Sequence, residues 1–521
     1  MIFLSINSFK MIKRDGTNVS IWQDHVQPYK SGNAANPRAI YDVIIVGGGI
    51  TGVSTALLLQ ESGKKCLLLE AANLCFGTTG GTTAHLNTLL DTSYSEISRN
   101  FSREDAKTVA RATRDAIELI RANIQLYGID CGFADVNAYL FAQDDKQAEE
   151  LESILKASRE AGLDINYCDK IPVPCNFTVA IRAYGQAKFN PLPYVYGLAK
   201  AFEKAGGIIQ QNCRVTGVEE NNILEVETTG DTYKTRNIVY ATHIPPGVNL
   251  LHLRCIPYRS YAMALKLADN RYPADLCYDM EDPYHYYRTQ QVNEQRYFIA
   301  GGKDHKTAHE DNTDSRFLQL ESHLRNIFQV KEINYHWSSQ FFESADGLPY
   351  IGHLPGHPEN VFVATGYGGN GMVYSSVAAH VLKEMVSTGK DQYHNVFNPN
   401  RVKPVAGFSN FIKHNADVVR QFAGKWFAHD QLEELSDLAH DEAKVVEYEN
   451  QKLALYKSKE GVIYALNPIC THLKCEVQWN MTEKTWDCPC HGARYSYEGK
   501  VITGPADQDL EQIEIRDLVG K

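Results

Sequence analysis

Short apolar runs and amphipathic stretches alternate along the first four hundred residues. Residues 42–46 form a short run rich in β-branched side chains, which predicts a buried parallel strand rather than an amphipathic helix. A glycine-rich turn, a helix from about Thr51 to Gly63 and a second apolar run at residues 66–69 follow. This order of strand, helix and strand predicts an α/β domain with a doubly wound parallel sheet.

The same kind of patterning continues downstream. Residues 255–267 alternate between apolar and polar positions and, together with residues 297–301, predict the antiparallel sheet of a second lobe. Residues 361–365 predict another buried strand, and the glycine-rich turn at residues 366–372 opens a helix that reaches residue 385. The other expected helices are residues 102–127, 146–161, 194–205 and 408–427, and the other expected strands are residues 208–213, 214–219, 222–227 and 237–242.

The pattern changes near residue 430, where short strands separated by Gly, Asn and Pro turns predict a small all-β module. Residues 13–38 are polar and rich in Pro, Gly and Asn, which predicts an irregular arm. We therefore expect an arm (1–39), a large domain (40–400), a linker with a helix (401–429) and the module (430–521). In the large domain we expect dinucleotide-binding parts at about 40–110, 195–250 and 340–395, and a substrate lobe at about 111–194 and 251–339.

The turn after the first strand has the spacing G-x-G-x-x-G. Gly47 allows the tight turn, Gly49 lets a pyrophosphate approach the backbone, and Gly52 lets the helix pack against the strand. The helix N-terminus presents N–H groups to such a phosphate, and Glu70 ends the next strand where a carboxylate binds a ribose hydroxyl. A glycine-rich turn without a ligand is the alternative, but a strand, helix and acid in register favour a bound dinucleotide.

Composition and charge narrow the class of protein. The 521 residues are 43% hydrophobic and 22% charged, which is typical of a globular protein. The net charge of −11 argues against nucleic acid as the main partner. No apolar run approaches the ~18 residues that cross a bilayer, and residues 1–9 lack the positive region of a signal peptide. We expect a cytoplasmic protein without a transmembrane segment, whether translation starts at Met1 or at Met11.

Four of the twelve cysteines lie in one short segment near the C-terminus. Cys470-Thr-His472 is followed, after fifteen residues, by Cys488-Pro-Cys490-His491. Two loops that each offer a thiolate and an imidazole suit a Rieske [2Fe–2S] cluster, in which one iron takes two Cys and the other two His. A Cys₂His₂ zinc site is the alternative, although zinc fingers rarely place a Cys and a His one residue apart in two mirrored loops.

The two loops, CTHLKC and CPCHGARY, resemble the cluster loops CTHLGC and CPCHGSxY of Rieske proteins of the respiratory-complex type. The resemblance implies that Cys470 and Cys488 hold one iron of the cluster. It implies that His472 and His491 hold the other.

The same resemblance assigns the residues around the ligands. It implies a disulfide between Cys475 and Cys490, and a hydrogen bond from Tyr495 to a ligand sulfur. Two positions depart from the pattern, since Lys474 replaces a glycine and Ala493 replaces a serine that hydrogen-bonds the cluster. Loss of a donor leaves the reduced cluster less stabilised, so we expect a potential in the lower part of the roughly −150 to +300 mV Rieske range.

Residues 40–395 resemble the glutathione-reductase-type FAD fold in its D-amino-acid oxidase branch, which includes glycine and sarcosine oxidases. The motifs that carry the resemblance are GGGITG with Glu70, GTTGGTTAH, Phe189-Asn190-Pro191, Val215, DGLPYIG and GYGGNGM. The resemblance implies FAD, with the adenosine at Gly47–Glu70 and Val215 and the isoalloxazine between the 78–85 loop and the 366–372 helix start. The expected FAD-binding residues are Gly47, Gly49, Ile50, Thr51, Gly52, Glu70, Ala71, Thr78, Thr79, Thr82, Thr83, Val215, Thr242, Gly366, Gly369, Gly371 and Met372.

The substrate lobe carries no comparable motif. A carboxylate substrate would need an Arg fork with Tyr hydroxyls, and Arg259, Tyr261, Tyr287 and Arg288 lie in the lobe expected to cover the flavin. Each of these residue types is more often structural. His85 receives no catalytic role, and direct hydride transfer from a deprotonated amine makes a protein base unnecessary in this branch.

A flavin takes a hydride, whereas a [2Fe–2S] cluster passes one electron at a time. The sequence therefore predicts a dehydrogenase that oxidises a small amine or amino-acid-like substrate and delivers electrons singly to an external acceptor such as a ferredoxin, cytochrome or quinone. The alternatives are a reductase fed by NAD(P)H or another external reductant, and a non-enzymatic redox sensor. A Rieske oxygenase is disfavoured, since no separate domain with a two-His, one-carboxylate iron site is evident.

Overall fold

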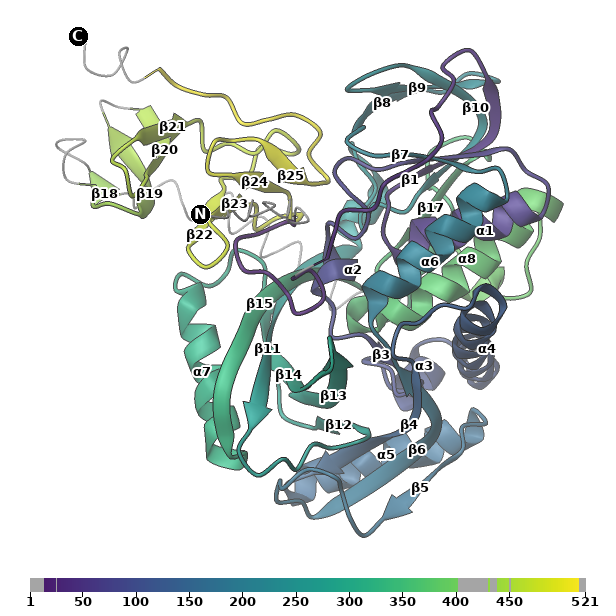
Figure 1. The fold of residues 1–521 in the computed structure, drawn as a ribbon, viewed down its shortest axis with the longest axis vertical. Helices are drawn as coiled ribbons and strands as arrows, with labels where there is room; N and C mark the ends of the chain where they lie inside the picture. The colour runs from purple at the N-terminus through teal and green to yellow at the C-terminus, as the bar shows by residue number, and fades with distance from the viewer. Residues whose placement is uncertain (1–13, 25, 402–429, 432–437, 449–450, 515–521) are drawn as a thin grey trace, which may run out of the picture.

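The structure is a computed structural model that describes residues 14–24, 26–401, 430–431, 438–448 and 451–514. Figure 1 shows three parts: a parallel sheet covered by helices, a large curved antiparallel sheet beside it, and a small β module near the C-terminus. The expected α/β class with an antiparallel lobe and an all-β module is confirmed. The helix expected at residues 408–427 lies outside the described residues.

The parallel sheet is built from the strands that the apolar runs predict. Its order is β16-β17-β10-β1-β2-β7, and β8 and β9 extend it through antiparallel pairing with β10. β1, β2, β7, β10 and β17 run parallel, and β16 pairs antiparallel with β17. The strands are β1 (Ile40–Val46), β2 (Cys66–Leu69), β7 (Ile208–Gln210), β8 (Val215–Glu219), β9 (Leu224–Thr228), β10 (Tyr233–Tyr240), β16 (Tyr350–His353) and β17 (Val361–Thr365).

Helices cover one face of this sheet. Figure 1 shows α1 (Ile50–Glu61) beside α6 (Pro191–Lys204) and α8 (Gly371–Thr388), with α4 (Arg103–Tyr127) next to them. Ser102 begins α4 as expected, because its side chain accepts a hydrogen bond from Asp105 N, and Gly128 ends the helix at a φ of +60°. The short elements here are α2 (Thr78–Gly81), α3 (Tyr94–Asn100), α9 (His394–Phe397), η1 (Leu250–Leu253) and η2 (Gly368–Asn370).

The second lobe is a nine-stranded sheet of order β15-β11-β14-β13-β12-β4-β6-β3, with β5 paired to β6. All its neighbours are antiparallel except β12 and β4. The strands are β3 (His85–Leu86), β4 (Ala134–Ala142), β5 (Ile165–Cys168), β6 (Val179–Lys188), β11 (Cys255–Leu267), β12 (Leu276–Asp279), β13 (Tyr286–Val292), β14 (Gln295–Lys306) and β15 (Val330–Ser344), with helices α5 (Asp145–Glu160) and α7 (Thr313–Ile327).

The C-terminal module contains two four-stranded sheets. One has the order β18 (Asp430–Gln431), β19 (Glu442–Tyr448), β20 (Gln451–Lys457), β21 (Ile463–Leu466). The other has the order β22 (Gln478–Asn480), β23 (Thr485–Asp487), β24 (Arg494–Ser496), β25 (Val501–Thr503). Its apolar core includes Trp486 and Tyr495, both fully buried.

The described part of the N-terminal arm has no helix or strand, yet it packs against both the large domain and the C-terminal module. Ser20 Oγ donates to Gly80 O and Trp22 Nε1 donates to Thr82 O, both in the glycine- and threonine-rich loop. Thr17 N donates to Glu483 Oε2 of the module at 2.8 Å. The arm thus links the module to that loop.

A buried cluster of charged side chains joins the module to the second lobe. Glu483 accepts from Ser338 Oγ at 2.7 Å and lies 3.7 Å from Arg14 Nη2. Asp487 lies 3.5 Å from Arg259 Nη2 and 3.2 Å from Arg494 Nε. Burial would raise the pKa of both carboxyls, but the surrounding guanidinium groups outweigh it and hold each pKa below its usual value.

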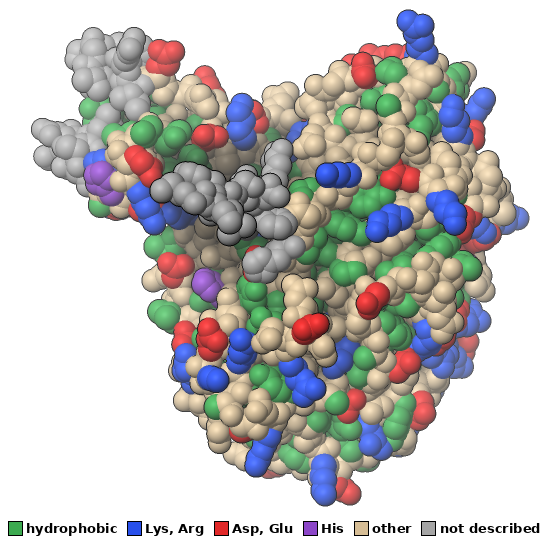
Figure 2. All heavy atoms as spheres, in the orientation of Figure 1, with side chains coloured by type: hydrophobic (Ala, Val, Ile, Leu, Met, Phe, Trp, Pro, Cys, Tyr) green, Lys and Arg blue, Asp and Glu red, His purple; other side chains and the backbone are tan. Residues whose placement is uncertain are grey.

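No described helix is long and apolar enough to pass through a membrane. On the face shown in Figure 2, basic and acidic side chains are interspersed, and no stripe of one sign crosses the described residues there.

Glu483→Gln tests whether this cluster holds the module in place. Removal of one charge from a buried ionic cluster leaves its partners uncompensated, so we expect a loss of about 3 kcal/mol in the free energy of unfolding, measured by urea denaturation. Since the pKa of the native carboxyl is lowered, its stabilisation is present above about pH 4.3 and is lost as the pH falls through the native pKa. Glu498→Gln, at an exposed position, is the control; equal stability of the two variants would contradict the role.

Candidate functional site

The glycines of the first turn are required by the geometry around them. Gly47 has a φ of +113°, and a Cβ there would lie 2.5 Å from Ala241 O. A Cβ at Gly52 would lie 1.9 Å from Gly47 O, because α1 crosses directly over the turn. The roles expected for the first and third glycines, a tight turn and close helix–strand packing, are therefore visible in the backbone.

Glu70 lies at the end of β2 beside this turn. Its Oε2 accepts from Gly48 N at 2.6 Å, and its Oε1 accepts from Ala72 N at 2.7 Å. Burial raises the pKa of Glu70 above its usual value despite these two N–H groups and the nearby Arg214. These hydrogen bonds fix the orientation of the carboxyl group.

One large cavity runs from this turn to the second lobe. It is lined by most of the residues expected to bind FAD: Gly47, Gly49, Ile50, Thr51, Glu70, Ala71, Thr78, Thr79, Thr82, Thr83, Val215, Thr242, Gly369, Gly371 and Met372. Gly52 and Gly366 do not line it. Gly52 packs against Gly47 and Ala241. Gly366, with a φ of +75°, forms the turn after β17.

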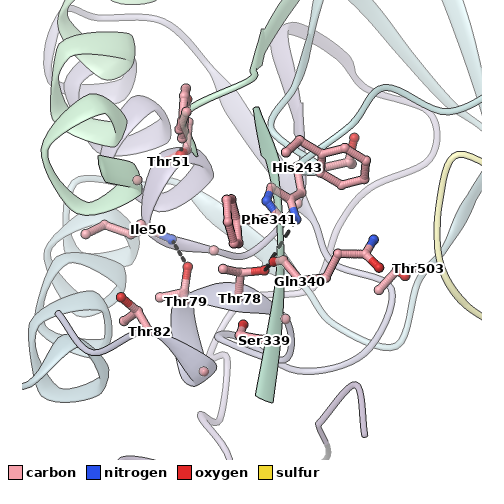
Figure 3. Close-up of a pocket in the computed structure, with 18 of the residues that line it drawn as sticks. Ile50, Thr51, Thr78, Thr79, Thr82, His243, Ser339, Gln340, Phe341 and Thr503 are labelled. Atoms are coloured by element: carbon pink, nitrogen blue, oxygen red, sulfur yellow. Dashed lines mark hydrogen bonds between the residues drawn. The ribbon is translucent and has the colours of Figure 1, made fainter. Parts of the chain in front are cut away.

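The threonine-rich loop forms the middle of the cavity. Thr79 Oγ1 accepts from Ile50 N at 3.1 Å, which joins the loop to the start of α1 (Figure 3). Thr78 Oγ1 donates to Gln340 O at 2.8 Å, which joins it to β15. A Cβ at Gly81 would lie 2.7 Å from Ser339 Oγ, so the glycine permits this close packing. The loop is held between the helix and the second lobe.

The four substrate-side candidates do not reach the cavity. Arg259 and Tyr261 alternate along β11 with Ser260 and Ala262, and it is Ser260 and Ala262 that line the cavity. Arg259 instead contacts Asp487 of the module, and Tyr261 OH hydrogen-bonds His305 Nε2 at 2.9 Å. Successive strand residues face opposite sides of a sheet. The residues of β11 that line the cavity are therefore the direct neighbours of the residues that were predicted to line it.

The same correction applies on β13. Tyr286 lines the cavity, whereas Tyr287 points into the lobe core and hydrogen-bonds His323 Nε2 at 2.7 Å. Arg288 is fully buried behind the threonine loop, where it donates to Thr83 O at 2.8 Å. Arg288 therefore contacts the loop from behind and does not line the cavity.

Sequence reasoning missed several lining residues because nothing local marks them. The alternation along β11 and β13 would have identified Ser260, Ala262 and Tyr286 if the face of each strand that lines the cavity had been known. Cys213, Arg214, His243 and Tyr367 adjoin predicted residues. Others come from distant segments, among them Asp15, Asp91, Tyr278, Tyr284, Asp304, Gln340 and Phe341, together with Ile502, Thr503, Gly504, Ala506 and Asp507 of the module.

The two Cys/His loops of the module come together as expected. Cys470 and Cys488 share a hydrogen bond, which lowers the pKa of Cys470 and raises that of Cys488. The rings of His472 and His491 lie with centroids 5.1 Å apart at 84°. His472 Nδ1 is buried without a hydrogen-bond partner, as expected for an atom that would bind a metal. Two thiols and two imidazoles at one place fit the ligand set of a Rieske cluster.

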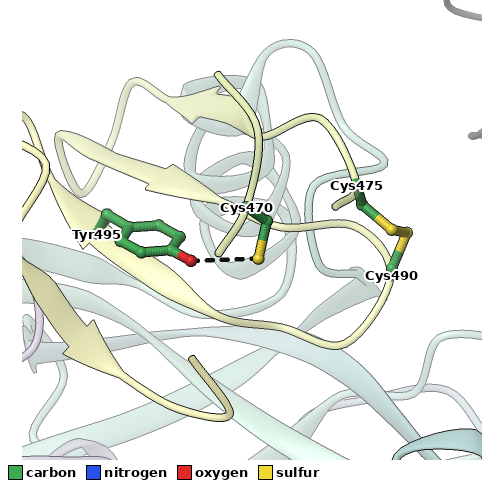
Figure 4. The surroundings of a disulfide bond; sticks show 4 residues. All are labelled: Cys470, Cys475, Cys490 and Tyr495. Atoms are coloured by element: carbon green, nitrogen blue, oxygen red, sulfur yellow. Dashed lines mark hydrogen bonds between the residues drawn. A yellow bond between two sulfur atoms is a disulfide. The ribbon is translucent and has the colours of Figure 1, made fainter. Parts of the chain in front are cut away.

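Residues around these loops also match the expectation. Cys475 and Cys490 form a disulfide, and Tyr495 OH lies 3.2 Å from Cys470 Sγ (Figure 4). Lys474 has a φ of +63°, a conformation that favours the glycine of the family pattern. Ala493 is fully buried and offers no hydroxyl where that pattern has serine.

The Cys/His loops contact the cavity wall directly. His472 Nε2 lies 3.0 Å from Gly247 O and 3.0 Å from His252 Nδ1, both of the large domain. Gln340 Nε2 donates to Gly492 O at 2.8 Å, and a Cβ at Gly492 would lie 2.7 Å from Pro257 Cβ. The glycine after His491 thus permits the module to approach β11 and β15.

Two histidines and a carboxylate do meet elsewhere, at Asp279, His285 and His323. They do not line the cavity. His285 Nδ1 lies 2.8 Å from Asp279 Oδ2, and the rings of His285 and His323 stack with centroids 3.6 Å apart at 11°. A metal lies near the plane of each imidazole ligand, and two stacked rings do not share such a point. The trio is a hydrogen-bonded network of the lobe core.

Comparison with known proteins agrees with both resemblances. A family model described as FAD dependent oxidoreductase matches residues 42–385, and one described as Rieske [2Fe-2S] domain matches residues 425–514. The chain is 31% identical over 478 residues to a Bacillus subtilis protein provisionally named as the Rieske 2Fe-2S iron-sulfur protein YhfW, across 91% of this chain and 93% of that protein.

Two more distant matches cover the large domain. The gamma-glutamylputrescine oxidoreductase of Escherichia coli is 24% identical over 382 residues, 70% of this chain and 88% of that protein. The crystal structure of glycine oxidase from Geobacillus kaustophilus superposes with a TM-score of 0.59 and 18% identity, covering 70% of this chain and 99% of that one. The structural likeness shows the fold.

Ala493→Ser tests the missing donor at the Cys/His loops. A new hydroxyl toward a ligand sulfur stabilises the reduced form, so we expect the midpoint potential to rise by up to about 100 mV, the equivalent of one charge-assisted hydrogen bond. The potential is measured by EPR-monitored redox titration. Lys474→Gly is the control, since it relieves the positive φ without adding a donor. An unchanged or lower potential in Ala493→Ser would contradict the prediction.

Proposed function

The chain belongs to the FAD-dependent oxidoreductase family and carries a C-terminal Rieske [2Fe-2S] domain, and from this premise we propose a dehydrogenase with an internal electron path. It oxidises a small amine or amino-acid-like substrate at a carbon–nitrogen bond and delivers the electrons singly to an external one-electron acceptor. The name of the Escherichia coli relative, an oxidoreductase of an amine, supports this class of substrate.

The cavity fits an extended dinucleotide. The pyrophosphate would lie at Gly47 and Gly49, over the start of α1, with the ribose at Glu70 and the adenine near Val215. The flavin ring would lie between the threonine loop and the start of α8 at Gly371, where a helix N-terminus stabilises negative charge. Cys470, Cys488, His472 and His491 would hold the cluster in the module.

FAD, when bound, accepts a hydride from the substrate, and the cluster accepts one electron at a time. The residues of the chain supply the geometry for this exchange. Thr78, Thr79 and the glycines beside them fix one face of the cavity, and Arg288 holds the loop from behind.

The observation that carries the proposal is the wall that the cavity shares with the module. Thr503 and Gly504 of the module line the same cavity as the FAD-binding loops. Pro246 also lines it, and the next residue, Gly247, contacts His472, a proposed ligand of the cluster. In Figure 3, Thr503 lies on the side of the cavity marked by His243 and Gln340. A path from the cavity to the proposed ligand is therefore a few residues long.

Anaerobic rapid mixing tests the function. We expect candidate amines to bleach the flavin absorbance first, and the EPR signal of the reduced cluster to follow. Bleaching by NADH or NADPH alone would favour a reductase instead. Intact cofactors that respond to no donor would favour a redox sensor. Flavin reduction without subsequent cluster reduction would contradict the internal path.

His252→Phe tests the contact at His472. The ring stays similar in size but loses the nitrogen that meets His472 Nε2, so we expect electron transfer from flavin to cluster to slow about tenfold while flavin reduction by the substrate is unchanged. His440→Phe, an exposed position in the module, is the matched control. Equal transfer rates in the two variants would show that the contact plays no part.

A further inference from the structure

The end of the cavity farthest from Glu70 is formed by the second lobe. It is lined by Ser260 and Ala262 of β11, Tyr286 of β13, Asp304 of β14 and Asp91 of the loop after β3. Under the proposed function, on which this inference rests, the substrate binds here against the flavin.

Two carboxylates face this end. Asp91 accepts from Gly369 N at 2.6 Å and from Tyr284 OH at 3.1 Å, which fixes its orientation toward the start of α8. Asp304 is hydrogen-bonded by Ser260, but its Oδ1 is buried and has no hydrogen-bond partner. A buried carboxylate oxygen without a donor is unfavourable, and a bound cation would satisfy it.

Electrostatics reinforce this requirement. Burial raises the pKa of Asp304 to about 7, the hydrogen bond from Ser260 lowers it, and the neighbouring Asp91 adds a smaller rise. Glu343, just outside the lining, has its pKa raised to about 8 by burial and by Asp91 and Asp304, against the lowering effect of Lys306. These buried carboxyl groups therefore disfavour one another's ionised form, and a bound cation would favour it.

Aromatic rings complete this end of the cavity. Tyr284 and Tyr286 lie with ring centroids 5.9 Å apart, and His85 lies 5.4 Å from Tyr278 and 5.7 Å from Tyr286. Tyrosine faces attract organic cations. Burial and the nearby Arg288 and Lys188 lower the pKa of His85 well below its usual value, so its ring adds no positive charge.

At this end, none of the described lining residues is a lysine or arginine that could receive a substrate carboxylate. Among the described residues that line the cavity, the one lysine or arginine is Arg214, at the opposite end beside Glu70. Arg259 is turned toward the module, and Arg288 is behind the threonine loop. A substrate carboxylate would face Asp91 and Asp304 without an Arg fork to bind it.

We infer that the substrate is an amine without a carboxylate, which binds as its ammonium ion to Asp91 and Asp304 within the tyrosine-lined end of the cavity and passes one proton to a carboxylate there before hydride transfer. The proposal narrows the amine or amino-acid class of the proposed function to simple amines.

Matched pairs of probes test this inference. n-Butylamine is compared with norvaline, and benzylamine with phenylglycine, so that each pair differs by one carboxylate. Binding to the oxidised holoenzyme is measured by perturbation of the flavin spectrum, and reduction is followed anaerobically. We expect each amine to bind at least about tenfold more tightly than its amino acid.

Asp304→Asn separates charge from shape, because the side chain keeps its size. We expect the affinity for n-butylamine to fall about tenfold or more and the affinity for norvaline to stay level or rise. Asp311→Asn, on an exposed loop, is the control and should bind as the unaltered enzyme does. Flavin content and melting temperature verify that both variants fold.

The outcomes separate the two proposals. If the amino acids bind and reduce the flavin in preference to the amines, and the cluster follows, the inference fails while the proposed function stands. If neither class perturbs or reduces the flavin although dithionite reduces both cofactors, both fail. Loss of amine binding in Asp304→Asn, with unchanged binding in Asp311→Asn, supports the inference.

Discussion

The hydrogen bonds between the Cys/His loops and the wall of the FAD cavity determine how the two redox groups meet. Gln340 contacts Thr78 through its backbone carbonyl and Gly492 through its side-chain amide, so one residue touches both sites. On the other side, His243, Ile244 and Pro246 line the cavity, and Gly247 and His252 of the same segment contact His472. The rate of electron transfer falls steeply with distance. A two-electron site and a one-electron site on one chain therefore exchange electrons efficiently only when such contacts hold them close.

This arrangement is stabilised by groups that are unfavourable when isolated. Glu483 and Asp487 are almost fully buried, and each is surrounded by guanidinium groups and hydrogen-bond donors. Removal of any partner would leave a buried charge uncompensated, which gives the docked position a specific geometry. The described part of the N-terminal arm adds to this, because it contacts Glu483 and the threonine loop together. Apolar packing alone would not fix the orientation of the module so closely.

Features of the sequence that are local and tied to backbone geometry were predictable. Gly47 and Gly52 could be interpreted because a side chain at either position collides with the backbone, and the Cys/His loops because metal ligands and their spacing are chemically specific. The faces of β11 and β13 were not predictable. Both faces of these strands are buried, so apolar alternation did not distinguish Arg259 and Tyr261 from Ser260 and Ala262. The contribution of Thr503 and Gly504 to the cavity was also hidden, since it arises from docking of a separate module.

A single measurement addresses the internal path most directly. Cluster reduction after a limiting pulse of reductant to the flavin is followed over a wide range of protein concentrations. Transfer within one chain predicts a rate constant that does not change with protein concentration. A rate that rises in proportion to protein concentration would mean that electrons pass between molecules, and would contradict a shared wall between the two sites.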